Sequence, residues 1–111
     1  MQTYSLTSVS DEQLELARAA SSGRSAVTLY GGREHDLRQT VIALAAGREL
    51  SEHESPGEAT LQVLRGHVRL HADAETWEGE AGDYLLIPAQ RHDLEAMSDS
   101  VVLLTVASRA G

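Results

Sequence analysis

Hydrophobic and polar residues alternate along most of the chain after Gly23. The clearest case is HVRLHA (67–72), where Val68 and Leu70 share one face and three polar residues share the other. Alternation of this kind is typical of a β-strand with one buried face. Similar segments, separated by Gly-, Asp- and Ser-rich turns, predict further strands at 25–30, 37–44, 60–66, 84–89, 92–96 and 101–107. Many short strands with turns between them indicate an all-β sandwich or barrel.

One segment, Ser10–Gly23, has the features of a helix. Ser10 is placed to cap its N-terminus, and Gln13 could complete a capping box. Gly23 can end the helix in the left-handed conformation. The predicted organisation is therefore an N-terminal segment with one short helix, residues 1–24, followed by a barrel, residues 25–111.

Composition narrows the range of functions. The chain has 111 residues, which predicts a single domain. It has no cysteine, so disulfides, thiolate zinc sites and a cysteine nucleophile are excluded. Its net charge is -8, whereas binding to nucleic acid or to an anionic membrane requires a basic face. Neither partner is expected.

The sequence also suggests where the protein is found. No apolar run approaches the roughly 20 residues of a membrane-spanning helix. The N-terminus lacks a basic region followed by an apolar one, so no signal peptide is predicted and a cytoplasmic location is expected. All nine basic residues are arginine, which suggests a GC-rich bacterial coding sequence.

Two stretches carry a specific resemblance. In the first, GRELSEHESPGEATLQVLRG, Gly47 is followed after five residues by His53, and the stretch closes at Gly66. In the second, Gly82 is followed after five residues by Pro88, and His92 comes shortly afterwards. These features resemble the two motifs of the cupin family, over about residues 37–107. The resemblance implies a double-stranded β-helix, or jelly-roll, barrel. It also implies a homodimer, for which we expect the helix and strand 25–30 to form the seam.

Metal-binding cupins hold an ion with two His and one Glu from the first motif and one His from the second. Carried onto this chain, those positions hold His53, Ser55, Ala59 and, one residue early, His92. Glu58 is adjacent to the Glu position, but alternation turns it to the opposite face unless a bulge intervenes. His53, His92 and Glu58 thus form a tentative metal site, suited to Mn, Fe, Ni, Cu or Zn.

Three functions remain open from the sequence. The preferred one is binding of a small molecule in the barrel without a full metal site. The second is a metal-dependent oxygenase or isomerase that uses His53, His92 and a carboxylate. The third is a metal-free enzyme in which a histidine acts as acid or base. No catalytic residue is assigned, and His35, His67 and His71 are expected at the surface. The residues expected to bind a ligand are His53, Ser55, Leu61, Val63 and His92.

Overall fold

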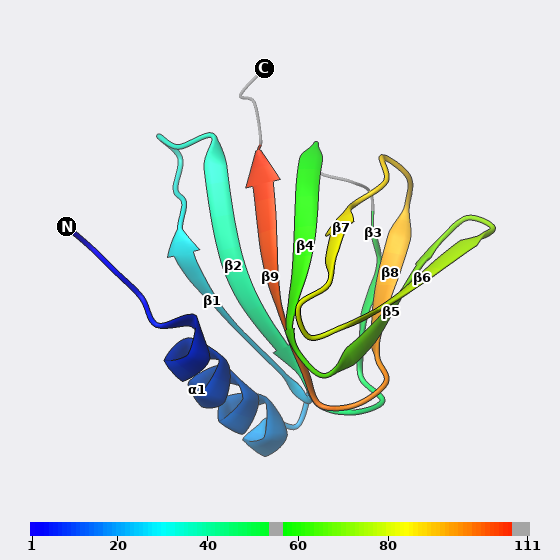
Figure 1. Cartoon of the computed structure of the whole chain (residues 1–111), viewed down its shortest axis with the longest axis horizontal. Coiled ribbons are helices and arrows are strands. Elements are labelled where there is room, and N and C mark those ends of the chain that lie inside the picture. Colours follow the sequence, from blue (N-terminus) through cyan, green and yellow to red (C-terminus); the bar gives the residue numbers. More distant parts are fainter. Residues whose placement is uncertain (54–56, 108–111) are drawn as a thin grey trace.

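The structure is a computed structural model that describes residues 1–53 and 57–107, apart from the side chains of Glu52 and His53. It has one helix and nine strands in the described ranges, and the strands form two antiparallel sheets that face each other (Figure 1). The predicted all-β barrel with one N-terminal helix is confirmed. No helix in these ranges is long and apolar enough to cross a membrane.

The larger sheet has five strands in the order β1-β2-β9-β4-β7. Its members are β1 (Arg24–Tyr30), β2 (Leu37–Leu44), β4 (Glu58–Arg65), β7 (Tyr84–Leu86) and β9 (Ser100–Ala107). The smaller sheet has four strands in the order β3-β8-β5-β6. Its members are β3 (Glu49–His53), β5 (His67–Ala72), β6 (Glu75–Glu80) and β8 (His92–Ala96).

The main core lies between the sheets and is aliphatic. Strand alternation directs Val68 and Leu70 of β5 and Leu94 of β8 toward Leu61 and Val63 of β4. The polar residues of β5 alternate with its buried ones, as the sequence predicted. These strands therefore follow the rule for a sheet with one face in the core.

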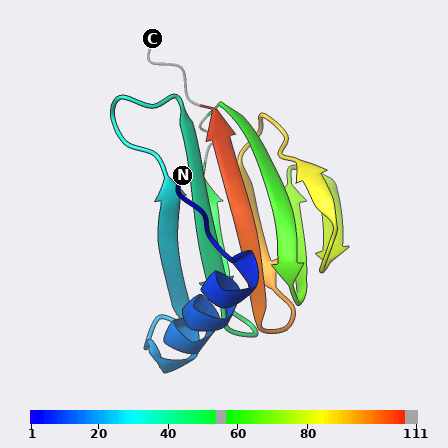
Figure 2. The same ribbon diagram turned by 60° about the vertical axis from the view of Figure 1, so that its left-hand side comes forward.

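Helix α1 (Leu6–Ala19) covers the outer face of the larger sheet, over β1 and β2 (Figure 2). It buries a second cluster that includes Leu14 and Ala17 of the helix and Val41 and Val101 of the sheet. Because β9 is covered on both faces, by the opposite sheet and by the helix, its sequence VVLLTVA is a continuous apolar run.

The predicted helix bounds were wrong. The helix begins at Leu6, where the Ser5 hydroxyl oxygen accepts a hydrogen bond from the Ser8 N–H, and it ends at Ala19 rather than at Gly23. Ser10 is not the N-cap but is buried against the sheet, with 1% of its surface exposed. Gln13 makes no capping box; its side-chain oxygen accepts a hydrogen bond from the Ser25 hydroxyl of β1. Ser10 and Gln13 therefore lie on the face of the helix that packs against the larger sheet.

The alternation of hydrophobic and polar residues did not reveal two of the strands. β3 and β6 are edge strands of the smaller sheet, and their sequences, ELSEH and ETWEGE, are mainly polar. β6 pairs with β5 from His67↔Glu80 to Ala72↔Glu75, and β3 pairs with β8. An edge strand that buries few side chains leaves little alternation in its sequence. Strand 84–89 is also shorter than predicted and ends at Leu86.

Candidate functional site

His92 lies at the start of β8, whose alternate residues His92, Leu94 and Ala96 are buried. Only 4% of the surface of His92 is exposed. Its Nδ1 lies 2.9 Å from the backbone oxygen of Gln90, and because a carbonyl can only accept, Nδ1 carries the proton of this bond. The imidazole is thereby fixed in orientation, with Nε2 as the acceptor nitrogen of its neutral form.

His53 is brought opposite His92. The two residues are partners in the pairing of β3 with β8, after a register irregularity that follows Leu50. On the other side of His92, the partner residue is Ala72 of β5. The side chain of His53, and Ser55 as a whole, lie outside the described part of the chain, so their roles stay predictions.

Glu58 does not lie with His92. The pairing of β4 with β9 is regular from Glu58↔Ala107 to Val63↔Val102. In this register Ala59 is buried, with 8% of its surface exposed, and Glu58 is exposed on the other face. The structure thus has the ordinary alternation rather than an inward Glu58, and a methyl group occupies the position where the first motif would supply its carboxylate.

Leu61 and Val63 are both in the interior, but they differ in their relation to His92. A small cavity of about 30 Å³ lies beside the imidazole, and Leu61 lines it whereas Val63 does not. This volume is enough for about one water molecule. Apart from His92, the described lining residues are all aliphatic: Ile42, Leu50, Leu61, Leu70, Ile87, Leu94, Val102 and Leu104.

A wider chamber of about 420 Å³ is lined by residues of β5, β6 and β7, of which β6 and β7 are edge strands of the two sheets. It is lined by Leu70, Ala72, Glu75, Thr76, Trp77, Leu85, Leu86 and Pro88. Leu70 lines both the chamber and the small cavity. The alternation pattern gave no sign of this chamber because it did not reveal β6, which supplies three of the lining residues.

Trp77 is held in place by the strand that carries it. A Cβ atom added at Gly79 would lie 2.1 Å from Cη2 of Trp77, so the indole ring occupies the space that any other residue at position 79 would fill. The ring also packs against the main core. The chamber therefore has one rigid aromatic wall.

The described residues do not form a metal site. In residues 1–53 and 57–107, without the side chains of Glu52 and His53, no group of three or more His, Asp or Glu is arranged to hold an ion. Among the described residues, His92 is the one such residue that lines the small cavity. A transition metal needs three or four N or O donors, so His92 would need further donors from outside the described part of the chain to hold one.

The other histidines lie apart from this cavity. On the outer face of the smaller sheet, Nε2 of His67 lies 2.7 Å from Oε1 of Glu78, and Nε2 of His71 lies 3.7 Å from Oε1 of Glu95. Arg69 lies between them and contacts both carboxylates. The hydrogen bond from His67, and then the charge of Arg69, lower the pKa of Glu78 below its ordinary value. These residues form a network of hydrogen bonds and charged contacts on the solvent-exposed face of the smaller sheet.

Residues 40–107 match the cupin domain family, a range that includes His53 and His92 and eight of the nine strands in whole or in part. The chain is a cupin. The resemblance of the two motifs is thus confirmed at the level of the family.

Solved structures agree with this assignment. A conserved protein of unknown function from Streptococcus pyogenes is 30% identical, with a TM-score of 0.73 over 83% of this cupin and 80% of that chain. A cupin superfamily protein from Desulfitobacterium hafniense is 18% identical, with a TM-score of 0.71 and 78% of each chain covered. Comparison with curated proteins found no match.

An enzyme is among the structural neighbours. The salicylate 1,2-dioxygenase of Pseudoaminobacter salicylatoxidans, solved in complex with gentisate, has a TM-score of 0.79 and 20% identity. The match covers 94% of this cupin but 33% of the dioxygenase chain. At this identity the comparison shows a shared fold, and fold does not determine function.

Proposed function

We propose that this cupin binds a small, largely apolar molecule in the chamber between β6 and β7, without a complete metal site. The observation that carries the proposal is the chamber itself. Its volume of about 420 Å³ lies within the range of ligand pockets, and most of its lining is apolar. Leu70 lines both this chamber and the small cavity beside His92, which is buried.

The polar groups of the chamber define what the ligand can be. Glu75 and Thr76 supply a carboxylate and a hydroxyl on β6, and the opposite wall is formed by Leu85, Leu86 and Pro88. An anion would meet a like charge at Glu75 and aliphatic surface elsewhere, at a high desolvation cost. A neutral molecule with one or two hydrogen-bonding groups fits this lining.

Binding can be followed with Trp77, the single tryptophan of the chain. Titration with benzyl alcohol is expected to change its fluorescence in a saturable manner and to raise the melting temperature, because a ligand selective for the native state stabilises it. Leu86→Ala removes a wall of the chamber and should weaken binding. Leu16→Ala is the matched control, since Leu16 is an exposed leucine on the helix that does not line the chamber. Equal affinities for the two variants would contradict the proposal.

The second part of the proposal, the incomplete metal site, is tested by elemental analysis. Untagged protein is dialysed with excess Mn, Fe, Ni, Cu or Zn, then against buffer, and its metal content is measured by plasma mass spectrometry. We expect far less than one ion per chain. About one retained ion per chain, lost in His92→Ala, would overturn this part and favour a metal-dependent enzyme.

We also propose that this cupin forms a homodimer through β1. Within the described residues, β1 pairs with β2 alone and is therefore one of the two edge strands of the larger sheet, the other being the short β7. An exposed edge presents unpaired backbone groups that a second copy can pair with. Sedimentation equilibrium should give twice the chain mass. Ala26→Lys, which adds a charge at an exposed position of that edge, should shift the equilibrium to monomers.

A further inference from the structure

A further cavity lies outside the barrel. It is a groove of about 730 Å³ on the outer face of the larger sheet, beyond the start of helix α1. The leucines along it are Leu6, Leu29, Leu37 and Leu103, and its remaining lining comes from Gln2, Tyr4, Tyr30, Glu34, His35, Asp36 and Gln39. The groove is separate from the chamber and from His92, so it does not depend on the function proposed above.

An irregularity in β1 builds the central wall of the groove. The pairing of β1 with β2 shifts between Thr28 and Tyr30, so that Tyr30 becomes the partner of Gln39. Leu29 and Tyr30, which are adjacent in sequence, thus both line the groove. A bulge of this kind re-aims a side chain that regular alternation would direct to the opposite face.

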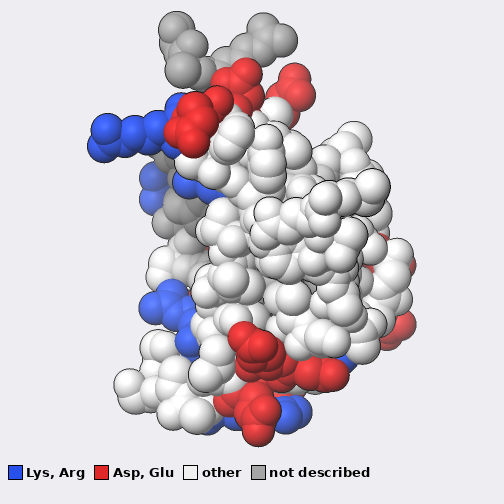
Figure 3. Space-filling view, turned by 90° about the vertical axis from the view of Figure 1, so that its left-hand side faces the viewer, with Lys and Arg blue, Asp and Glu red and all other residues white. Residues whose placement is uncertain are grey.

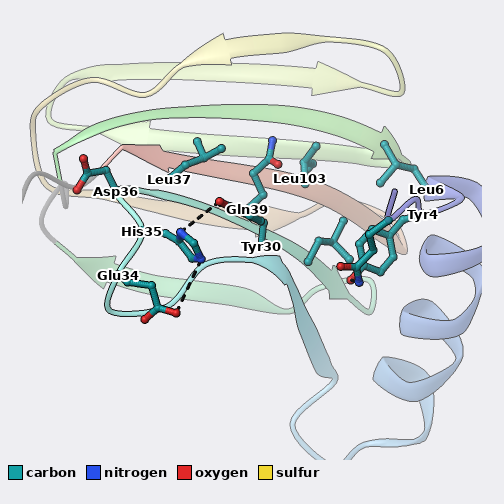
Figure 4. A pocket seen from close by; sticks show the side chains of 11 residues that line it. Tyr4, Leu6, Tyr30, Glu34, His35, Asp36, Leu37, Gln39 and Leu103 are labelled. Carbon is teal, nitrogen blue, oxygen red and sulfur yellow. Dashed lines mark hydrogen bonds and ion pairs between the residues drawn. The ribbon is translucent and has the colours of Figure 1, made fainter.

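Tyr30 is fixed in its new direction by His35. The two ring centroids are 4.6 Å apart, and the Tyr30 hydroxyl shares a hydrogen bond of 3.2 Å with Nδ1 of His35. His35 comes from the loop between β1 and β2, and its Nε2 lies 3.9 Å from a carboxylate oxygen of Glu34 (Figure 4). The loop is therefore anchored over the sheet, and Glu34 and Asp36 are held at this end of the groove (Figure 4).

The polar groups of the groove are mainly acceptors. Among the described lining residues, Glu34 and Asp36 are the acidic ones, and none is an arginine. Arg38, the nearest arginine in β2, packs instead against Gly31, where an added Cβ would lie 3.0 Å from its Cγ. The amide nitrogen of Gln39 donates to Thr105, which leaves its carbonyl oxygen as the acceptor.

The two ends of the groove differ in character. The carboxylates lie at the loop end, whereas Tyr4 and Leu6 lie at the helix end (Figure 4). Figure 3 shows this side of the molecule with an uncharged centre and charged side chains gathered toward its ends. A molecule that follows the groove would therefore meet negative charge at one end and apolar and aromatic surface along the rest.

We propose that this groove is a second binding site, which takes a small organic cation: an amine attached to an aromatic or aliphatic body. The ammonium group pairs with a carboxylate of the loop end, Asp36 or Glu34, which extend to different sides of His35 (Figure 4). The apolar body covers the leucines toward Tyr4. The volume of about 730 Å³ is within the range of small-molecule sites.

The test uses three probes of similar shape and different charge. 2-Phenylethylamine, 2-phenylethanol and 3-phenylpropanoate are titrated separately into ¹⁵N-labelled protein, and amide chemical shifts are recorded. The amine is expected to shift the signals of residues 29–39 with saturation. Because an exposed ion pair contributes up to about 1 kcal/mol, the alcohol should bind about fivefold more weakly, and the carboxylate more weakly still.

Variants separate this site from general charge effects. Glu34→Gln combined with Asp36→Asn should reduce the affinity for the amine about fivefold or more. Glu12→Gln combined with Glu15→Gln makes the same change in net charge on exposed helix residues and should leave the affinity unchanged. Equal binding of the amine and the alcohol would overturn the proposal, as would an equal effect of the two double variants. So would sedimentation and cross-linking data that place a second copy over the groove.

Discussion

Among the glycines of the fold, we expect substitution of Gly66 by alanine to lower the free energy of unfolding most. Gly66 joins β4 of the larger sheet to β5 of the smaller one, with φ of +82°. A Cβ atom there would lie 2.3 Å from the backbone oxygen of Asp99 and 2.8 Å from Cα of Ser100. These are backbone atoms of the β8–β9 corner and cannot move aside as a flexible side chain can.

Gly47 provides a matched comparison. Its φ is +84°, but a Cβ there would meet nothing within 4 Å. Gly47→Ala should therefore cost about 1 kcal/mol, from the left-handed conformation alone. Gly66→Ala adds a steric term of about 1–3 kcal/mol, because the two corners must separate. It also disturbs the Ser100 hydroxyl, which accepts a hydrogen bond from the His67 N–H.

Urea unfolding of the two variants measures this difference. We expect Gly66→Ala to lose about 2 kcal/mol or more beyond the loss in Gly47→Ala, equivalent to roughly 8 °C in melting temperature. Gly82→Ala should behave like Gly47→Ala, since φ is +96° and the space around it is also open. If all three variants lost the same free energy within ~0.5 kcal/mol, the argument from the close corner would be refuted.

Three further predictions concern a charge, a core residue and the missing carboxylate. The backbone N–H of Ala46 and then the guanidinium of Arg18 hold the pKa of Asp99 below its ordinary value. The ionised Asp99 therefore stabilises the fold at pH values above its ordinary pKa, and this stabilisation is lost as the pH falls through the lowered pKa. Asp99→Asn should therefore lower the urea midpoint at neutral pH, by an amount equivalent to at most ~1 kcal/mol, and the difference should vanish in acid; a constant difference would contradict this. Leu70→Ala should cost about 2–5 kcal/mol in urea unfolding and, by joining the two cavities, should tighten binding of benzyl alcohol in the fluorescence titration; unchanged affinity would show that Leu70 does not separate them. Ala59→Glu should raise the zinc retained after dialysis, with circular dichroism to confirm folding, and an unchanged zinc content would mean that this carboxylate alone does not limit metal binding.

Most of the fold could be predicted from the sequence because most strands bury one face. Alternation located β5 from His67 to Ala72 and β8 beside it from His92 to Ala96. The alternation pattern did not reveal edge strands such as β6, because pairing with β5 rather than burial of one face defines them. The start of the helix was not predicted from the sequence, because its packed face contains Ser10 and Gln13, which are residue types usual at a surface.

The candidate site was less predictable, for reasons that are also physical. Parity along β4 predicted Leu61 inside and Glu58 outside, and both are so. The chamber depends on β6 and β7, which are neighbours only across the gap between the sheets. The outer groove depends on a shift of one residue in β1, which places Tyr30 beside Gln39. No local pattern in SAVTLY marks that shift.

The register of β4 connects these observations to the kind of ligand that the barrel can hold. With Ala59 inside and Glu58 outside, the carboxylate that the first motif would supply is replaced by a methyl group, and the cavity beside His92 is lined by aliphatic side chains. A charged ligand in that cavity would lose its hydration without gaining a partner of opposite charge, at a cost of several kcal/mol. The Nδ1 atom of His92 is engaged by the backbone oxygen of Gln90. We therefore expect a ligand that extends from the chamber toward the histidine to be neutral on that side and to place its polar atoms near Glu75 and Thr76.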